Sequence, residues 1–483
     1  MLDIGMLDKT KFYINGSWVQ SLDGQIFPVL NPATECAFAT ITLGGTQDAE
    51  GAIAAAKGAF PAWSVTSSDE RSSYLQKLLD IYIKRNDEMG ATISTEMGAP
   101  IDMALRDQAG AGVGHLKSFI RALGAMKFQR PLRDGIEGQD IVFEAAGVAA
   151  LITPWNWPMN QVVLKVGAAL AAGCTMVLKP SEIAPMSSIL FTEMVHEAGF
   201  PAGVFNMVNG DGVGVGTFLS SHPDVDVVSF TGSTRAGILI SKAAADTVKT
   251  VSLELGGKSP NLVFDDCDVE KAVRMGAAFC FNNTGQSCNA ATRMIVQRSI
   301  YDQAVEIAAA KADATKVDLP SNAGKHIGPL VSEAQFEKVQ RMIQSGIDEG
   351  ARLVAGGVGR PEGINRGWFV KPTVFADAKK DMTIVREEIF GPVLALMPFD
   401  NEEEGISLAN DTPYGLAAYI QTGDMGRARR VAAKLRAGMI QVNGASRAPG
   451  SPFGGYKQSG VGREGGFWGI EEFLEIKTIS GIA

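Results

Sequence analysis

The sequence has few of the residues that build metal centres and disulfide frameworks. It holds 5 cysteines and 4 histidines among 483 residues, and no two cysteines form a CxxC pair. An odd number of scattered cysteines predicts neither a disulfide scaffold nor a zinc cluster, and we expect no metal site. The cysteines are Cys36, Cys174, Cys267, Cys280 and Cys288, and the histidines are His115, His196, His222 and His326.

Basic charge and long apolar runs are also scarce. Lys and Arg total 44 against 53 Asp and Glu, so the formal net charge is −9. This balance disfavours a nucleic-acid surface, which needs clustered basic residues. The sequence contains no apolar run of the roughly 20 residues that a membrane span requires. Its first residues also lack the basic-then-apolar pattern of a secretory signal. We therefore expect a soluble, cytoplasmic protein that binds neither nucleic acid nor membranes.

A length of 483 residues predicts two or three domains. In the first part of the chain, the spacing of apolar residues changes several times. Residues 11–30 alternate in polarity around Asn15-Gly16 and Asp23-Gly24, which predicts a small antiparallel hairpin. Residues 46–126 carry apolar side chains at helical spacing. Residues 127–146 resemble a pair of strands with turns at Pro131, Gly135 and Gly138. They form either a plain surface hairpin or an arm that pairs with another subunit.

From Gly147 onward, short apolar runs alternate with helical segments. Such alternation with short connections predicts a parallel, doubly wound sheet, in which ligands bind beyond the carboxyl ends of the strands. A second α/β unit follows from residue 258, and residues 472–482 are expected to pair with the strands of 127–146. The strands expected in the first unit are 148–153, 175–178, 204–208, 225–230 and 250–255.

Glycines and polar residues follow each of these strands. Glycines at a strand-to-helix turn let backbone N–H groups approach a phosphate, and the helix dipole adds to the attraction. Lys and Glu side chains there can bind ribose or phosphate oxygens. The glycine-rich segment departs from GxGxxG because Val215 replaces the third glycine. The segments are PWNWP (154–158), KPSE (179–182), NGDGVGVG (209–216), FTGST (230–234) and ELGGK (254–258).

The stretch FNNTGQSCNA, residues 281–290, places Cys288 among small and amide residues. Gly285 permits a tight turn, and backbone N–H groups can stabilise a thiolate in such a setting. A thiol of this kind is a candidate covalent nucleophile. The alternative is a buried core cysteine, since unpaired Cys is among the most buried residue types.

These segments occur in one order along the whole chain, and together they resemble the NAD(P)-dependent aldehyde dehydrogenase superfamily, non-acylating type. The motifs that carry the resemblance are PWNWP, KPSE, FTGST, ELGGKSP, FNNTGQSCNA, EEIFGPV and SPFGGYKQSG.

The resemblance implies three catalytic residues. Cys288 is the nucleophile that attacks the aldehyde carbon to give a thiohemiacetal and, after hydride loss, a thioester. Glu254 is the general base that activates water for deacylation, a role that suits a carboxylate whose pKa burial raises. Asn156 is an oxyanion donor that acts with the backbone N–H of Cys288. The alternative for Glu254 is an ion-paired residue at the end of a strand, and the alternative for Asn156 is a turn residue near Pro158.

The resemblance also implies an NAD site. Glu182 favours NAD, because a 2′-phosphate beside a carboxylate would be repelled, although use of NADP stays open. Lys179 and Glu182 match positions at the adenosine ribose, and Glu388 and Phe390 match positions at the nicotinamide ribose and ring. The remaining expected cofactor residues are Ile152, Trp155, Gly212, Gly216, Gly232, Ser233 and Leu255.

The substrate is the least defined part. The resemblance implies that Trp157, Leu164 and Phe453 line an entry tunnel, whose apolar walls suit an aliphatic or aromatic aldehyde. Arg447, in the loop 444–452, either binds a substrate carboxylate, as in a semialdehyde, or is a solvated loop residue.

The resemblance further implies a domain plan and an assembly. We expect an NAD-binding domain from 1–126 and 147–257, a catalytic α/β domain from 258–457, and a small β oligomerisation arm. The arm comprises 127–146 with the C-terminal segment 458–483, and a homodimer or homotetramer is expected to form through it.

Two other functions are alternatives to this interpretation of the sequence. A CoA-acylating dehydrogenase would release the acyl group to CoA, but Glu254 and the lack of a CoA-binding feature disfavour it. A non-enzymatic structural protein on the same fold would be expected to have lost its nucleophile, base or cofactor residues, and this chain keeps all three.

Overall fold

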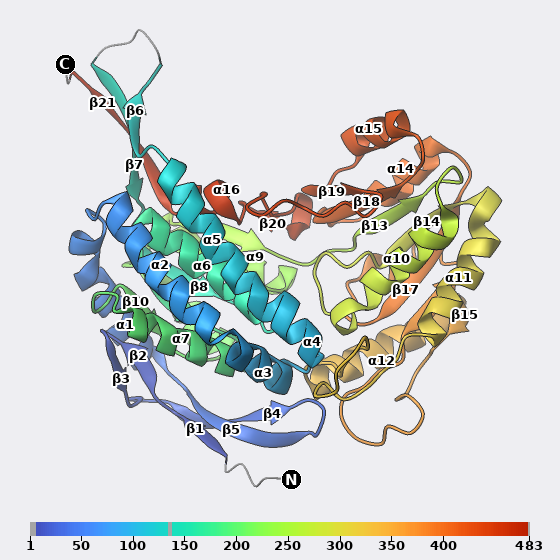
Figure 1. Cartoon of the computed structure of the whole chain (residues 1–483), viewed down its shortest axis with the longest axis horizontal. Coiled ribbons are helices and arrows are strands. Elements are labelled where there is room, and N and C mark those ends of the chain that lie inside the picture. Colours follow the sequence, from blue (N-terminus) through green and yellow to red (C-terminus); the bar gives the residue numbers. More distant parts are fainter. Residues whose placement is uncertain (1–5, 134–137, 482–483) are drawn as a thin grey trace.

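The computed structural model describes residues 6–133 and 138–481, and its strands form two large and two small sheets (Figure 1). The larger of the two main sheets has eight strands and the other has seven. In spatial order, the eight strands are β20 (Gly460–Val461), β12 (Thr250–Glu254), β11 (Val227–Thr231), β8 (Val148–Ile152), β9 (Thr175–Lys179), β10 (Phe205–Met207), β2 (Phe12–Ile14) and β3 (Ser17–Val19).

The centre of the eight-stranded sheet is parallel, as the sequence predicts. Strands β12, β11, β8, β9 and β10 pair in parallel, while β2, β3 and β20 are added in antiparallel fashion at the two edges. The chain runs outward from β8 through β9 to β10 and then returns to β11 on the other side. The strand order therefore reverses between β8 and β11, and ligands of doubly wound sheets bind beyond the carboxyl ends at such a point. This arrangement confirms the α/β fold class.

Helices pack on this sheet, and two clusters of buried apolar side chains form its core. Every residue of α6 except Asn160 is buried, since its run of Val, Leu and Ala packs on all sides, and Gly173 ends it with a positive φ of 94°. The main helices are α1 (Thr46–Trp63), α2 (Ser68–Lys84), α3 (Asn86–Met97), α5 (Gly110–Ala125), α6 (Pro158–Ala172), α7 (Met186–Ala198), α8 (Thr217–Ser221) and α9 (Thr234–Ala244), and the short α4 (Ile101–Met103) precedes α5.

The seven-stranded sheet lies beside the first and is also mostly parallel, with only β15 antiparallel (Figure 1). Its strands, in order, are β15 (Arg352–Ala355), β16 (Thr373–Ala376), β17 (Val393–Phe399), β14 (Arg293–Gln297), β13 (Pro260–Val263), β18 (Ala417–Gln421) and β19 (Met439–Val442). Its helices are α10 (Val269–Phe281), α11 (Tyr301–Asp313), α12 (Glu333–Asp348), α13 (Thr383–Arg386), α14 (Glu402–Asn410) and α15 (Met425–Lys434). The short α16 (Gly466–Glu471), near the end of the chain, packs instead against α5 and α6 of the first sheet.

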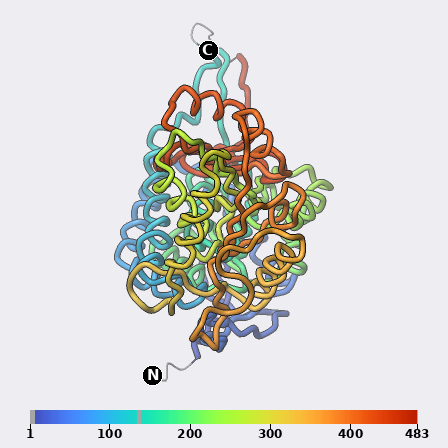
Figure 2. Tube along the Cα trace, turned by 90° about the vertical axis from the view of Figure 1, so that its right-hand side faces the viewer, coloured from blue at the N-terminus to red at the C-terminus, as the bar shows by residue number. Residues whose placement is uncertain are grey.

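A three-stranded ribbon projects from the body beside the C-terminus (Figures 1 and 2). It consists of β6 (Gln129–Pro131), β7 (Gln139–Ala145) and β21 (Leu474–Ser480), all antiparallel. The predicted pairing of the C-terminal segment with 127–146 is confirmed, although Gly135, predicted to form the turn, lies outside the described residues. The rest of the C-terminal segment behaves differently, because β20 joins the eight-stranded sheet.

The N-terminal hairpin differs in part from the prediction. Strands β2 and β3 do pair around Asn15-Gly16, but Asp23-Gly24 is not a hairpin turn. The carboxylate of Asp23 instead accepts hydrogen bonds from the N–H groups of Gly45 and Gln47 at the start of α1. This contact directs the chain into β4 (Gln25–Asn31), which pairs with β5 (Cys36–Leu43), and β1 (Leu7–Lys9) completes a separate small sheet.

None of the helices in residues 6–133 and 138–481 combines the length and apolar composition needed to cross a membrane. In the same residues, no group of three or more His, Cys, Asp or Glu side chains is arranged as metal ligands.

The buried Arg293 provides a test of how β14 is joined to α14 and to the segment before β13. Its guanidinium donates to the carbonyl oxygens of Lys258 (2.9 Å), Leu408 (2.9 Å) and Ala409 (2.8 Å). Arg293→Met would leave these acceptors unpaired, and we expect urea unfolding to show a loss of about 3 kcal/mol or more. The control Arg298→Met removes an exposed ion pair with Asp400 from the same segment and should cost less than about 1 kcal/mol. Equal losses in the two variants would contradict the assigned role.

Candidate active site

A cavity of about 230 Å³ opens where the strand order of the first sheet reverses. One wall is the loop after β8, and another is the loop after β11. The remaining walls come from residues 255–256, from the segments that contain Cys288 and Glu388, and from α12. The position agrees with the rule for ligand sites in doubly wound sheets. The lining residues are Pro154, Trp155, Asn156, Thr231, Gly232, Ser233, Leu255, Gly256, Cys288, Gln335, Lys338, Glu388 and Phe390.

The segment before Cys288 has an uncommon backbone conformation. Asn283, Thr284 and Gly285 adopt positive φ values of 53°, 57° and 72° in succession. A left-handed conformation is strained for residues with a side chain and persists where surrounding contacts enforce it. A Cβ atom at Gly285 would stand 2.1 Å from the backbone of Gly391, so glycine is required there. This turn presents the partly exposed Cys288 to the cavity.

Two further glycines allow three distant segments to meet. A Cβ at Gly257 would lie 2.3 Å from the carbonyl oxygen of Cys288, and one at Gly256 would lie 2.4 Å from Oε2 of Glu388. The N–H of Gly257 donates to Oε1 of Glu388 over 3.0 Å. The glycines of ELGGK therefore bring the thiol segment and the EEIFGP segment against the end of β12.

Asn156 is held by contacts on both its side chain and its backbone. Its Nδ2 donates to the carbonyl of Gln286 (3.0 Å), and its own carbonyl accepts from Asn283 Nδ2 (2.9 Å) and Gln108 Nε2 (3.3 Å). A primary amide has two N–H hydrogens, so one of them is available to a ligand in the cavity beside Cys288.

Glu254 ends β12 and is almost completely buried, at 3% exposure. Neither carboxylate oxygen has a hydrogen-bond partner among the described residues. Burial raises the pKa of Glu254 well above its ordinary value, and the nearby charge of Glu464 raises it further. Glu464 is itself buried and pairs with Lys165 Nζ over 2.6 Å. A buried, unpartnered carboxylate with a raised pKa has the properties of a general base or acid.

The pKa of the Cys288 thiol depends on the carboxyl groups of Glu254 and Glu388. Burial raises its pKa, and the charges of Glu388 and Glu254 raise it further, while the backbone N–H groups of Cys288 and Asn289 act in the opposite direction. Burial also raises the pKa of Glu388. Ionisation of the thiol is therefore coupled to the charge of both carboxyl groups.

The remaining predicted cofactor residues form a second group beside this cavity. Lys179 Nζ lies 3.6 Å from Glu182 and donates to the carbonyls of Pro180 (2.9 Å) and Gly210 (2.6 Å). Burial lowers the pKa of Lys179. Ile152 pairs with Lys179 across β8 and β9. A Cβ at Gly216 would come within 3.9 Å of the Lys179 side chain, and that at Gly212 would meet open space.

The predicted substrate residues lie on another side of the thiol segment. Leu164, Arg447 and Phe453 line a separate cavity of about 250 Å³. Trp157 lies outside that lining and donates from Nε1 to Ser287 Oγ (2.8 Å), next to Cys288.

Several residues of the site have little or no signal in the sequence. A charged residue inside the apolar helix α6 was a visible signal for Lys165, but nothing in the sequence points to its partner Glu464. Gln335 and Lys338 of α12 also line the first cavity, and His115 the second. Their helices carried no motif, so only the fold brings them to the site.

The charge of Glu388 predicts a change in thiol reactivity that does not depend on turnover. Glu388→Gln keeps an acceptor for Gly257 but removes a negative charge, so the pKa of Cys288 should fall. Alkylation of Cys288 by iodoacetamide at pH 8, followed by mass spectrometry of its peptide, should become roughly threefold to tenfold faster, because the thiolate is the reactive form. Glu387→Gln, at the exposed neighbouring position, should leave the rate unchanged. An unchanged or slower rate in Glu388→Gln would contradict the assigned electrostatics.

Comparison with known proteins identifies the family. Residues 18–479 match the profile of the Aldehyde dehydrogenase family. A 3-succinoylsemialdehyde-pyridine dehydrogenase from Pseudomonas sp is 50% identical over 477 residues, which cover 99% of each chain. An aldehyde dehydrogenase structure from Bartonella henselae has 56% identity and a TM-score of 0.97, over 98% of this chain and 100% of that chain. A cysteine-to-alanine variant of aldehyde dehydrogenase C from Pseudomonas syringae, in complex with NAD+ and octanal, has 47% identity and a TM-score of 0.96, over 98% and 97%. The chain belongs to the aldehyde dehydrogenase family.

Proposed function

We propose that the protein oxidises an aldehyde to a carboxylic acid, with NAD+ as hydride acceptor and water as the second substrate. The observation that carries this proposal is the convergence of Cys288, Asn156 and Glu388 on one cavity at the switch point of the sheet, with Glu254 buried close by. The NAD+ complex of the Pseudomonas syringae relative supports the choice of cofactor.

The residues at the switch point fit a dinucleotide. Gly232 and Gly256 leave the cavity wall without side chains, and Ser233 caps the eleven-residue helix α9, whose amino end is favourable for phosphate. Glu388 keeps Oε2 for a ribose hydroxyl, and the rings of Trp155 and Phe390 meet edge to face at 5.4 Å. We assign Ile152, Leu255, Gly212 and Gly216 to the same site, with Lys179 and Glu182 at the adenosine ribose. NAD+ bound there supplies the acceptor for the hydride.

In the acylation half, the Cys288 thiolate attacks the aldehyde carbon and forms a carbon–sulfur bond. The carbonyl oxygen becomes an oxyanion, and the second N–H of Asn156 with the N–H of Cys288 can donate to it. Loss of hydride from the tetrahedral carbon leaves a thioester on Cys288. Each oxyanion donor typically contributes about 3 kcal/mol to lowering such a barrier.

In the deacylation half, Glu254 accepts a proton from water while the water oxygen bonds to the thioester carbon. The carbon–sulfur bond then breaks, releasing the acid and restoring the thiolate. The raised pKa of Glu254 suits this transfer, since a base titrating nearer neutrality drives it better than an ordinary carboxylate. The two unpartnered oxygens of Glu254 leave acceptor sites for water.

Glu182 supports NAD over NADP, because its carboxylate would repel a 2′-phosphate. We assign the NAD-binding domain to 1–126 and 147–257 and the catalytic domain to 258–457, with the ribbon as an oligomerisation arm. Strand β20 is an exception, since residues 460–461 of the C-terminal segment belong to the first sheet. A reactive thiol that works with NAD+ fits a reducing compartment, and we propose a cytoplasmic location.

Two active-site variants test the reaction. Cys288→Ala should reduce NADH formation from NAD+ and an aliphatic aldehyde at least about 10³-fold, because no thioester can form. Glu254→Gln should give a burst of about one NADH per active site followed by slow turnover, since acylation proceeds and deacylation stalls.

The matched control is Cys36→Ala. It removes an exposed thiol that is distant in sequence from Cys288, and the variant should retain activity. NADH formation that survives in Cys288→Ala would refute the mechanism. Faster turnover on addition of CoA, with a CoA thioester as product, would instead favour the acylating reaction.

We also propose a homodimer or homotetramer built through the ribbon. A projecting three-stranded ribbon has little core of its own, and Ile476 on β21 is 68% exposed. Light scattering should give a multiple of the 51.1 kDa chain mass, and Ile476→Asp should lower the assembled fraction. Ile26→Asp is the control, because Ile26 is 67% exposed on the other small sheet. A monomeric wild type, or equal dissociation in both variants, would contradict this surface.

A further inference from the structure

The cavity of about 250 Å³ between α5, α6 and the loop 444–452 contains a single full charge among its described lining residues, that of Arg447. His115 lines the same cavity, but burial lowers its pKa, and its Nε2 is hydrogen-bonded to Asn160 Oδ1 at 2.8 Å. Leu164 and Phe453 supply apolar walls, and no lining residue is acidic. The described lining of the cavity is therefore uncharged except for the cationic side chain of Arg447.

The guanidinium of Arg447 contacts an aromatic ring but has no acidic partner among the described residues. Its Cζ lies 4.8 Å from the ring centroid of Phe453, a cation–π distance that fixes its position. It forms no ion pair or side-chain hydrogen bond within the described part of the chain. Since a guanidinium has five N–H donors, Arg447 has the capacity for a bidentate contact with a carboxylate.

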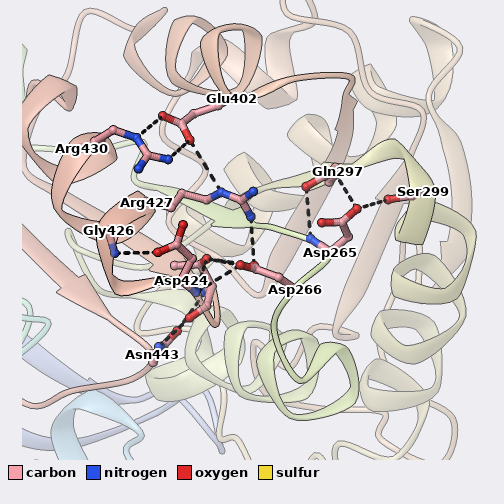
Figure 3. Close-up of polar contacts among 11 residues, drawn as sticks. Asp265, Asp266, Gln297, Ser299, Glu402, Asp424, Gly426, Arg427, Arg430 and Asn443 are labelled. Carbon is pink, nitrogen blue, oxygen red and sulfur yellow. Dashed lines mark hydrogen bonds and ion pairs between the residues drawn. The ribbon is translucent and has the colours of Figure 1, made fainter.

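A network of polar contacts holds Asn443, the residue just before the loop that carries Arg447 (Figure 3). Asn443 Nδ2 donates to the Thr422 carbonyl (2.9 Å), and Thr422 N–H donates back to Asn443 Oδ1 (3.0 Å). Thr422 Oγ1 donates to Asp266 (2.8 Å), which pairs with Arg427 over 3.1 Å. Asn443 is thus held with a φ of 51°, four positions before Arg447. Because the start of the loop is already fixed, binding a ligand to the loop costs less conformational entropy.

Arg447 also lies near the reacting sulfur. Phe453, on which it stacks, packs in the same apolar cluster as Cys288. Arg447 is exposed, but the charges of Tyr419, Cys288 and Glu254 lie near enough to act on its guanidinium. A substrate that reaches Cys288 with its aldehyde can therefore place a distal group close to Arg447.

We propose that Arg447 is a specificity-determining residue that binds the distal carboxylate of an ω-carboxylated aldehyde, so that semialdehydes are preferred over uncharged aldehydes of equal length. This inference rests on the proposed function. The 250 Å³ cavity holds the chain of the substrate, with Leu164 and Phe453 against its methylene groups.

The test compares ω-oxoalkanoates of four, six and eight carbons with the n-alkanals of the same length. The wild type should show a higher kcat/KM for at least one charged member than for its uncharged counterpart. Arg447→Gln should lower kcat/KM for that member roughly 10- to 100-fold, mainly through KM, and leave the alkanals within about twofold. Arg447→Lys should restore part of the loss. The KM for the charged member should also rise with salt in the wild type and not in Arg447→Gln.

Arg436→Gln is the matched control, since Arg436 is an exposed arginine over the ring of Tyr456 at 5.7 Å, and it should leave the preference intact. Turnover of n-alkanals by the wild type keeps the two proposals separate, because the oxidation itself fails if no aldehyde is turned over. The carboxylate proposal is overturned if the wild type prefers the alkanal at every length. It is equally overturned if Arg447→Gln slows charged and uncharged substrates alike, which would assign Arg447 to stabilising the Cys288 thiolate.

Discussion

Close contact between backbones at glycines is the constraint on which the site depends. Gly285 lies against the backbone of Gly391, and Gly257 lies against the carbonyl of Cys288, at distances that no Cβ atom would permit. Through these contacts the end of β12, the thiol segment and the EEIFGP segment meet in one place. A side chain at either glycine would push Cys288 away from Glu388 and from the loop that carries Asn156, whatever chemistry those residues retain.

The second feature of the site is the accumulation of buried acidic groups. Glu254, Glu388 and Glu464 lie close enough for their charges to act on one another or on Cys288, and a single lysine, Lys165, pairs with Glu464. Burial disfavours the ionised forms of Glu254 and Glu388. Because the charges of both carboxyl groups raise the pKa of Cys288, a change of charge at either one alters the ionisation of the thiol.

Much of the fold and of the site was predictable because the relevant signals are local. The alternation of strands and helices from Gly147 onward predicts the parallel sheet, and each motif lies at a strand end or a turn whose backbone requires those residues. The positions of Asp23 and Glu464 were not predictable, since both act on partners far along the chain. Asp23 holds the start of α1 instead of a hairpin turn, and Glu464 reaches Lys165 only when α6 packs against the C-terminal region.

The ribbon has a consequence for synthesis of the chain. Strand β7 ends at Ala145, whereas its neighbour β21 begins at Leu474, so one edge of β7 stays open while most of the protein is being made. Unpaired strand edges invite association between nascent chains. The acidic side chains of Asp140 and Glu144 on β7 oppose such association by mutual repulsion. When β21 arrives, Lys477 pairs with Glu144 and part of this repulsion is removed on the finished protein.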